Sequence, residues 1–339
     1  AAMTLRRRDR TRRRFDLVYA HNQYAAPAGR IVSRILGVPN VTRLYGTFLA
    51  DLMKRPLVAL RYPVAAAGYL VPSDLLICCN DGTRGDEVAR KLKTDPRRFR
   101  FWPNGVDLPA ERPGLTRADL AQRFADAALA VGTPWILSCS RLSYWKRIDR
   151  ILRALRYAAD RGCDCMLVAA GDGPERQRLT DLAAELKLQG RVAWLGAVSH
   201  DEIWALMNVC DIFMITNDVT NRCNPLYEAM CAGVPVVTVA DPSSADLVEN
   251  GVNALLADKD DTDELGRCLE RLLSDGELAA RLRRGQLDKA AGLWSWQERM
   301  ETEVRELEEL TGRGPAGRLP AGPRDGTTLP PTAKEVPGI

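Results

Sequence analysis

Glu228 is the residue whose type and setting say most about the chemistry of this chain. It opens the segment EAMCAGVPVV, in which a short predicted helix runs through a Gly-Val-Pro turn into an apolar strand. The loop before this helix follows another predicted strand, 212–215, and in an open parallel sheet such loops lie where ligands bind. Free N–H groups and the helix dipole favour an anion there. A carboxylate beside an anion needs a different partner, and a pair of sugar hydroxyls is the natural one.

Two cations lie in a second predicted strand-to-helix loop. Arg141 and Lys146 belong to the run SRLSYWK, which starts at Ser140 after the predicted strand 135–139. At this spacing both side chains can reach one phosphate group, arginine with a planar fork and lysine with a compact charge. A pair of solvated surface cations is the plainer alternative. The position at the carboxyl end of a strand favours phosphate binding.

A pair of glycines follows the next predicted strand. Gly171 and Gly173 flank Asp172 and precede Pro174. Glycine lets the backbone approach a ligand closely, but it also simply makes turns. The spacing does not fit the GxGxxG dinucleotide fingerprint, and the sequence contains no GxxxxGK[ST] phosphate loop.

The chain has two histidines. His21 ends a predicted apolar strand, where it can orient or polarise a substrate hydroxyl; a structural histidine explains it almost as well. His200, between Ser199 and Asp201, is interpreted as a neighbour of a helix cap and is given no role. With so few histidines we expect no histidine-rich metal site, and no metal ligand is assigned.

Apolar runs at strand and helix spacing alternate along two blocks, which predicts parallel sheets covered on both faces. The expected strands are 17–20, 41–45, 75–79 and 98–102 in the first block, and 135–139, 165–169, 192–195, 212–215, 234–239 and 254–256 in the second. The predicted organisation is a first domain over 1–110, a linker over 111–134, a second domain over 135–290, a terminal helix over 291–311, and a tail over 312–339 that is too rich in Gly and Pro to order itself.

Composition limits the partners and the compartment. The 339 residues carry a formal net charge of +4, so nucleic-acid binding is not expected. An arginine-rich run over 6–14 is interpreted as a solvated face, with an anionic membrane surface as the less favoured partner. Nine cysteines without CxxC spacing indicate reduced thiols in a cytoplasmic protein. The apolar stretch 56–79 is interrupted by charges and prolines, which favours a core or interfacial helix over a membrane span.

Arg141, Lys146, the turn 171–174 and Glu228 follow one another in an order that resembles a known family. The family is that of retaining, nucleotide-sugar-dependent glycosyltransferases of the GT-B fold, the group 1 or family-four type. The likeness to its donor-binding domain spans 135–273. The segments DLVYAH and PNGVD and the helix at Trp296 are similar to parts of the acceptor domain and to a terminal helix that crosses back onto it. The implied fold is α/β, GT-B-like, with two doubly wound, Rossmann-like domains facing a cleft.

The resemblance also implies roles for individual residues. Arg141 and Lys146 would bind the donor diphosphate and stabilise the leaving group, and Glu228 would accept hydrogen bonds from the ribose hydroxyls. His21 would lie near the reacting sugar and is assigned to catalysis with the two cations. The donor-binding candidates are Ser140, Arg141, Lys146, Gly171, Gly173, Val192, Leu195, Gly196, Asn221, Arg222, Cys223, Asn224, Pro225, Leu226 and Glu228. No metal or other cofactor is expected, because cations and a helix terminus stabilise the charge.

The chain departs from the family pattern in two places. A second glutamate, eight positions before Glu228, binds the transferred sugar in the family; here that position is Thr220. Sugar recognition is therefore expected to differ, or activity to be reduced. The first block also has few strands and no glycine-rich loop before residue 17. We therefore expect a shortened acceptor domain with an exposed sheet edge and poor transfer.

These patterns favour a cytoplasmic glycosyltransferase. It would move a sugar, with retention of configuration, from a nucleoside diphosphate sugar to a saccharide or lipid-linked acceptor, and would contact the inner membrane surface peripherally. One alternative is a noncatalytic nucleotide-sugar-binding protein or inactive homologue, which Thr220 favours. A second is a GT-B epimerase that acts on the nucleotide sugar itself. The sequence does not specify the base, the sugar or the acceptor.

Overall fold

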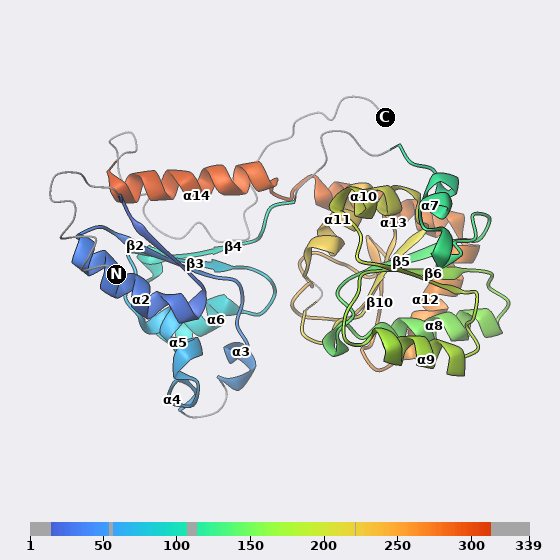
Figure 1. The fold of residues 1–339 in the computed structure, drawn as a ribbon, viewed down its shortest axis with the longest axis horizontal. Helices are drawn as coiled ribbons and strands as arrows, with labels where there is room; N and C mark the ends of the chain where they lie inside the picture. The colour runs from blue at the N-terminus through green and yellow to red at the C-terminus, as the bar shows by residue number, and fades with distance from the viewer. Residues whose placement is uncertain (1–14, 54–56, 107–113, 221, 313–339) are drawn as a thin grey trace. The chain divides into compact units, whose positions relative to one another are not determined.

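The computed structural model describes residues 15–53, 57–106, 114–220 and 222–312. The chain forms two compact units (Figure 1). Within the described residues, the first comprises those up to Gly105 together with those from Trp294 to Gly312, and the second comprises those from Val106 to Leu293. The arginine-rich run 6–14 and the tail after Gly312 lie outside the described residues, so the expectations for them stay predictions.

The first unit is built on four parallel strands in the order β1-β2-β3-β4. They are β1 (Val18–His21), β2 (Asn40–Leu44), β3 (Leu75–Cys79) and β4 (Phe99–Trp102). Right-handed crossovers that step across a sheet in one direction leave the connecting helices on one face. These helices are α2 (Asn22–Leu36), α3 (Leu49–Leu52), α4 (Val58–Arg61), α5 (Pro63–Leu70) and α6 (Gly85–Lys91). Helices α3 to α6 bury Leu44, Leu76 and Cys78 of the sheet.

The opposite face of this sheet is covered by α14 (Trp296–Thr311), which follows the second unit in the sequence (Figure 1). The apolar contact joins Leu307 and Leu310 of the helix to Val41, Leu75 and Ile77 of the strands. The helix expected over 291–311 is thus part of the first unit.

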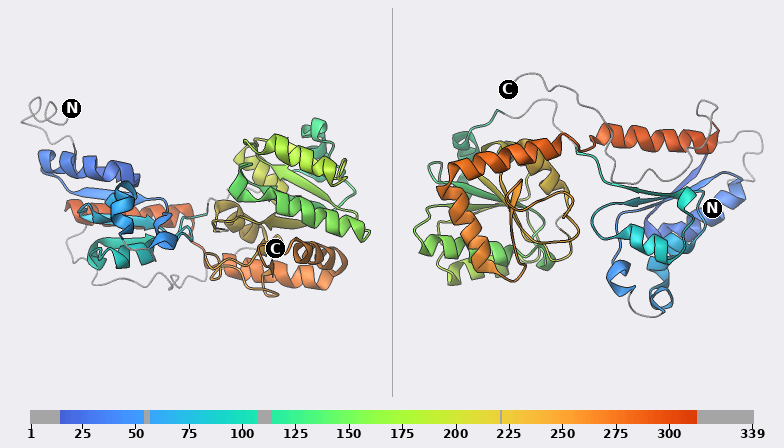
Figure 2. Two further views of the ribbon diagram at one scale, coloured as in Figure 1. Left: turned by 90° about the horizontal axis from the view of Figure 1, so that it is seen from below. Right: turned by 180° about the vertical axis from the view of Figure 1, so that it is seen from behind.

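The second unit contains six parallel strands in the order β10-β9-β8-β5-β6-β7. The strands are β5 (Trp135–Cys139), β6 (Met166–Ala170), β7 (Val192–Gly196), β8 (Ile212–Ile215), β9 (Val236–Val239) and β10 (Ala254–Ala257). The helices are α7 (Arg117–Arg123), α8 (Ile148–Asp160), α9 (Arg176–Glu185), α10 (His200–Val209), α11 (Asn224–Ala232), α12 (Thr262–Ser274) and α13 (Gly276–Ala290). Figure 2 shows helices on both faces of this sheet.

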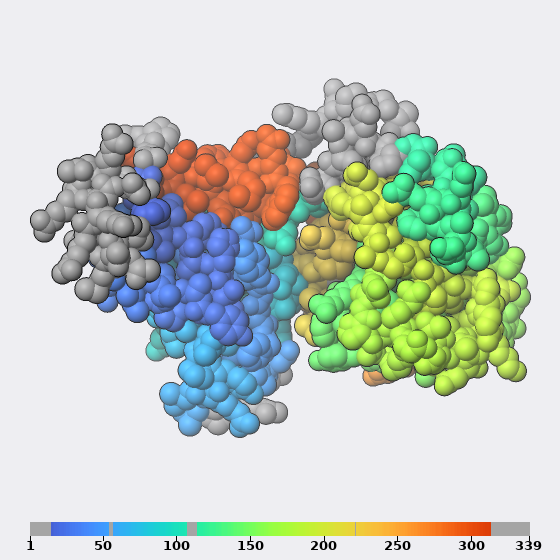
Figure 3. All heavy atoms as spheres, in the orientation of Figure 1, coloured from blue at the N-terminus to red at the C-terminus, as the bar shows by residue number. Residues whose placement is uncertain are grey.

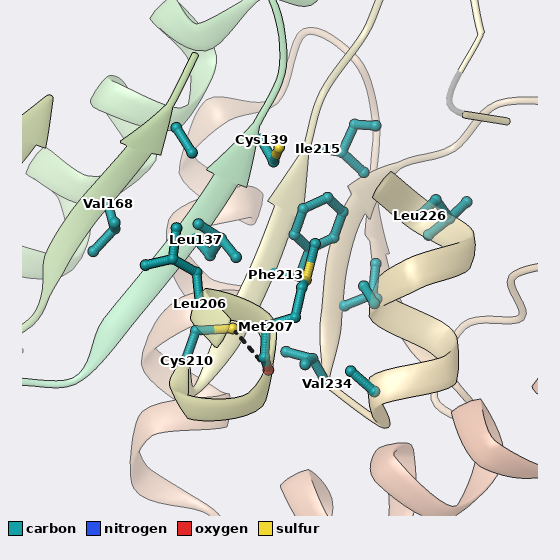
Figure 4. Packing of buried hydrophobic residues seen from close by; sticks show 14 of the residues in the cluster. Leu137, Cys139, Val168, Leu206, Met207, Cys210, Phe213, Ile215, Leu226 and Val234 are labelled. Carbon is teal, nitrogen blue, oxygen red and sulfur yellow. Dashed lines mark hydrogen bonds between the residues drawn. The ribbon is translucent and has the colours of Figure 1, made fainter. Parts of the chain in front are cut away.

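Alternation along the strands divides the interior of the second unit into two apolar clusters. Leu137, Val168 and Phe213 face α10 and α11, and Figure 4 shows them packed with Leu206 and Leu226. The intervening residues, among them Ile136, Leu167 and Met214, face α8, α9 and α12 on the other side. Both faces of the sheet are therefore buried under helices, as expected for parallel strands.

The α/β fold class and the ten expected strands are confirmed, with strand ends displaced by one or two residues. The linker expected over 111–134 is corrected. Within that range α7 starts at a capping box on Thr116, and Leu120 is fully buried in the cluster on the α10 face. A helix of only two turns carries too few apolar positions to show a clear period in the sequence.

The apolar stretch 56–79 divides between core and surface. Its last five residues form the buried strand β3, and Val58 and Tyr69 are also buried, whereas Leu57, Leu60 and Val64 are exposed. In the space-filling view the segment around α4 projects from the body of its own unit (Figure 3). Within the described residues, no helix has the length and apolar character needed to span a bilayer.

Candidate functional site

The strand order of the second unit contains one reversal of direction. From β5 the chain steps to β6 and β7, then returns to β8 on the other side of β5. At such a switch point two neighbouring loops diverge and leave a crevice at the carboxyl ends of the strands. The loops concerned follow β5 and β8, and they contain the predicted cations and the segment that leads to Glu228.

Partly buried ion pairs join these two loops to each other. Asp218, after β8, accepts hydrogen bonds from Arg150 at 2.7 Å and from Arg147 at 3.2 Å. Arg150 is 3% exposed and also donates to the carbonyl of Thr216 at 3.0 Å. The backbone N–H of Asp218 donates to the carbonyl of Trp145 at 2.9 Å. The loop that carries Lys146 is therefore held rigidly beside β8.

Arg147 gives this loop its shape. Its φ of 51° lies in the left-handed region that non-glycine residues rarely adopt. The hydroxyl of Thr216 donates to its carbonyl at 2.9 Å, and its guanidinium pairs with Asp149 at 3.0 Å. Sequence reasoning missed Arg147 and Arg150 as structural supports. The sequence did offer one signal for Arg150: it lies among the apolar residues of helix α8, where a charged side chain needs a protein partner.

The two predicted cations differ in exposure. Arg141 is exposed, and within the described part of the chain its guanidinium has no hydrogen-bond or ion-pair partner. Lys146 is half-buried at the end of a short 3-10 turn, Tyr144–Lys146. Ser140 is half-buried at the start of the same loop. An arginine without a protein partner at a switch point is available to an anionic ligand.

The charges of Lys146 and Glu228 have opposite effects on the pKa values of two cysteine thiols, Cys139 and Cys223. Burial raises the pKa of the Cys139 thiol to about 12; the charge of Glu228 adds to this rise and that of Lys146 opposes it. Burial also raises the pKa of Cys223, which Lys146 lowers and Glu228 raises. Lys146 follows β5, and Glu228 lies on α11, which follows β8. These two strands are neighbours in the sheet, so an ammonium and a carboxylate belong to the segments that flank the switch point.

The two glycines after β6 are required by contacts between loops. A Cβ on Gly171 would lie 2.0 Å from the carbonyl oxygen of Ser140, and one on Gly173 would lie 2.3 Å from that of Leu142. The N–H of Leu142 in turn donates to the carbonyl of Asp172 at 3.0 Å. The glycines therefore set the position of the loop that carries Arg141, whether or not they touch a ligand.

The segment expected to contact the base ends beside this loop. The N–H of Gly171 donates to the carbonyl of Gly196 at 2.7 Å, so the loops after β6 and β7 are joined. Gly196 has a φ of 72°, which turns the chain out of β7. Val192 and Leu195 pack on opposite clusters of the core and are partly exposed. The backbone after Leu195 is the part of this segment that lies at the carboxyl end of its strand, where ligands bind in such sheets.

Glu228 lies in the second turn of α11 and is 7% exposed. Its Oε1 lies 3.1 Å from Nε2 of His200, the first residue of α10. A carboxylate only accepts hydrogen bonds, so the imidazole in this pair carries its hydrogen on Nε2. Sequence reasoning gave His200 no role, because its partner is 28 residues away and is reached only through the packing of two helices.

The guanidinium of Arg222 is hydrogen-bonded to protein groups. Its guanidinium donates to the carbonyl of Ser243 at 3.0 Å, to the hydroxyl of Tyr227 at 3.2 Å, and to Asp246. The side chain is 7% exposed. These contacts join the start of α11 to the loop after β9, and the assignment of Arg222 to donor binding stays a prediction.

The remaining candidates lie around the start of α11. Cys223 is the residue that precedes the helix, Pro225 occupies its first turn, and Asn224 is exposed. Leu226 is fully buried in the core, so its side chain packs against protein (Figure 4). Asn221 lies outside the described residues.

Thr220, at the position of the family's second glutamate, takes part in a polar network. Its hydroxyl lies 2.9 Å from that of Ser243, and its carbonyl accepts from Asn217 at 2.8 Å. Ser243 donates in turn to the buried carboxylate of Asp241. The threonine thus ties the loop after β8 to the loop after β9.

His21 belongs to the first unit, at the carboxyl end of β1. Its ring stacks on Tyr19 with 4.7 Å between centroids, and its Nδ1 lies 2.6 Å from the hydroxyl of Tyr45. His21 and Tyr45 are exposed, so the hydrogen-bonded ring is open to solvent. In the parts of the chain that the structure describes, no group of three or more His, Cys, Asp or Glu side chains is arranged to hold a metal ion.

Comparison with known proteins was made for sequence and for structure. Residues 122–286 match the family model "Glycosyl transferases group 1", and residues 1–109 match "Glycosyltransferase Family 4". The 2-deoxystreptamine glucosyltransferase of Streptomyces kanamyceticus is 28% identical over 290 residues, which is 80% of this chain and 72% of that one. The UDP-Gal:alpha-D-GlcNAc-diphosphoundecaprenol alpha-1,3-galactosyltransferase of Escherichia coli is 24% identical over 265 residues, 77% and 67% of the two chains.

The fold has solved relatives. HepE from Anabaena, crystallised in complex with UDP, superposes with a TM-score of 0.70 at 22% identity, over 89% of this chain and 81% of that one. Each unit of the present chain has the parallel α/β architecture found in such enzymes. The two family matches fall in different units, and both are to glycosyltransferase models; the chain has the GT-B fold and is similar in sequence to the group 1 glycosyltransferases.

Proposed function

We propose that this glycosyltransferase moves a hexosyl group, with retention of configuration, from a nucleoside diphosphate sugar to a saccharide or lipid-linked acceptor. The observation that carries the proposal is the joint position of Lys146 and Glu228. Lys146 follows β5 and Glu228 lies on α11 after β8, and these neighbouring strands flank the switch point of the second sheet. A diphosphate beside the cation and a ribose beside the carboxylate match this pair chemically.

In this proposal the diphosphate is bound by Arg141 and Lys146. Breaking the bond between the sugar and the diphosphate leaves negative charge on the departing phosphate oxygen. Cations that are already in place stabilise that charge without reorganisation at the moment of reaction. The ion pairs of Asp218 with Arg147 and Arg150 join the segment next to Lys146 to the loop after β8, which supports a fixed backbone at this position.

His21 is proposed to contact the reacting sugar, on the strength of the resemblance at DLVYAH. Its hydrogen bond with Tyr45 supports a defined ring orientation. Retention would be tested by NMR of the product of an α-linked donor: an α-linked product is expected, and a β-linked product would exclude a retaining mechanism. Because cations replace a divalent ion in the proposal, EDTA should leave the transfer rate unchanged.

The acceptor class follows from the relatives and is proposed in general terms. By name, one relative glucosylates 2-deoxystreptamine and another acts on a diphosphoundecaprenol-linked sugar. A lipid-linked acceptor would require peripheral contact with a membrane on the cytoplasmic side. The exposed Leu57 and Leu60 support such contact. Replacing both by Gln should reduce co-sedimentation with vesicles; unchanged sedimentation would remove this support.

The site assignment is tested by calorimetric titration with UDP, ADP and GDP. UDP is the first probe because HepE was solved with it. Arg141→Ala and Lys146→Ala should each weaken binding of the diphosphate by ~1.5–3 kcal/mol, the range for loss of a hydrogen bond to a charged group. Arg153→Ala, which removes an exposed arginine of α8, is the matched control and should not change affinity.

Product analysis distinguishes the alternatives. A noncatalytic binding protein would bind the nucleoside diphosphate sugar without consuming it in any acceptor screen. An epimerase would convert the donor when no acceptor is present. Transfer that requires an acceptor is the expected outcome for the enzyme proposed here.

A further inference from the structure

His200 is the first residue of α10, and its ring contacts an aromatic ring of the same helix. The capping box between Ser199 and Glu202 fixes the first turn of α10, and the ring of His200 meets that of the buried Trp204 edge-on at 6.3 Å. The side chain is 46% exposed, so the ring lies at the surface with one edge directed at Glu228. Its position follows β7 by only a few residues, which places it beside the segment expected to contact the base.

Glu228 has the opposite environment. Its side chain is 9% exposed and lies on α11, which packs against α10 (Figure 1). A buried carboxylate needs compensating partners, and its direction depends on them. A carboxylate has about four acceptor positions, and the hydrogen on Nε2 of His200 takes one of those on Oε1, so the carboxylate can accept from more than one donor. A hydroxyl ligand can therefore bind the carboxylate while the histidine remains attached.

We propose that His200 is a positioning residue for nucleotide recognition: it orients the Glu228 carboxylate toward the ribose and so sets a preference for ribonucleotides over 2′-deoxyribonucleotides. This inference rests on the proposed function, in which Glu228 accepts hydrogen bonds from the ribose. A purely structural pair would join α10 to α11 and would affect stability, without any effect on the discrimination between the two sugars. The ratio of the two affinities is therefore the decisive quantity.

The experiment is calorimetric titration of the full chain with whichever of UDP, ADP or GDP binds most tightly, and with its 2′-deoxy counterpart. His200→Leu removes the donor and keeps an apolar side chain against Trp204. We expect it to weaken ribonucleotide binding about tenfold, the equivalent of one hydrogen bond to a charged group. Binding of the 2′-deoxynucleotide should change less than about threefold, so the preference collapses.

Three further variants make the result specific. His200→Gln supplies an amide donor of similar reach and should restore much of the preference, whereas His200→Asn is too short and should behave like His200→Leu. If the leucine variant does not fold, His200→Asn provides the same test. Asp201→Asn changes an exposed charge on the same helix turn and should leave the ratio unchanged. Glu228→Gln should abolish the preference.

The possible outcomes distinguish a failure of the role of His200 from a failure of the proposed nucleotide site. Loss of the preference in Glu228→Gln with no loss in His200→Leu and His200→Asn would overturn the role of His200 and leave the ribose site intact. An unchanged preference in Glu228→Gln would remove Glu228 from the ribose, and both assignments would fall. Absence of binding by all three nucleoside diphosphates would overturn the proposed donor site itself.

Discussion

Two arginines close to the same sheet edge have opposite environments. Arg141 is exposed and has no partner within the described residues, whereas Arg222 is buried and donates to three groups. Protein partners occupy the hydrogen-bonding capacity of one and leave that of the other available. Charge type alone does not show whether an arginine is engaged by protein; the number of its partners does.

This difference predicts opposite effects of two alanine substitutions. Arg222→Ala removes donors from the carbonyl of Ser243 and the hydroxyl of Tyr227 and should lower the free energy of unfolding by about 2–3 kcal/mol. Arg141→Ala should leave the unfolding free energy unchanged while weakening nucleotide binding. Urea denaturation of both variants checks this, and equal stability of Arg222→Ala and the parent would contradict the structural role.

The pH dependence of stability contains a contribution from Asp149. Burial tends to raise its pKa, but the hydrogen bonds and charge of Arg147 outweigh burial and leave the pKa below its usual range. A depressed folded pKa contributes stability that is complete above the unfolded pKa of about 3.9 and is lost as the pH falls through the folded value. The stability difference between the parent and Asp149→Asn should therefore be constant between about pH 5 and 7 and shrink below about pH 4. A difference that grew at low pH would contradict this sign.

At the scale of elements, the site depends on loops packed backbone against backbone. Gly173 approaches the carbonyl of Leu142 so closely that an added methyl would displace the loop containing Arg141 and Lys146. Gly173→Ala should therefore weaken nucleoside diphosphate binding at least tenfold, and should also lower the melting temperature. Gly276→Ala is the matched control, because a Cβ there meets nothing within 4 Å. Normal affinity in Gly173→Ala would show that the loop can shift without loss of the site.

The elements were largely predictable from sequence because the parallel strands are continuous apolar runs, which need no knowledge of their neighbours. Arg141, Lys146 and Glu228 were chosen as candidates on the same basis, because each follows one of these apolar strands in the sequence. Contacts across long sequence separations were not predictable. His200 reaches Glu228 across 28 residues, and Arg222 reaches Asp246 across 24. Whether a polar residue is satisfied by protein depends on such packing, which no local pattern encodes.

At the scale of the whole molecule, each unit has an interior of its own. In the second unit the two faces of the six-stranded sheet are buried by their own helices. In the first unit one face is buried by α3 to α6 and the other by α14. Domains with separate cores can unfold separately, and a ligand stabilises the part that binds it.

A buried ion-pair network between α14 and the sheet allows the first unit to be destabilised by a single substitution. Glu303 is 1% exposed and accepts hydrogen bonds from Tyr19 and from Arg43, at 3.2 Å for Arg43, and it pairs with Arg299 at 2.8 Å. Glu303→Gln keeps the shape but leaves two buried guanidinium groups without a countercharge. Removing one partner of a buried ion pair costs about 3–5 kcal/mol.

Calorimetric unfolding should therefore show two transitions that respond to different changes. The tightest-binding nucleoside diphosphate, at a hundred times its Kd, adds about 2.7 kcal/mol to the state that binds it and should raise one transition by about 5–10 °C. Glu303→Gln should lower the other transition and leave the ligand-sensitive one in place. When the variant is measured with the ligand, the two shifts should appear together and add, because sites without shared partners are independent. A single transition moved by both the ligand and the substitution would show instead that the two units unfold as one.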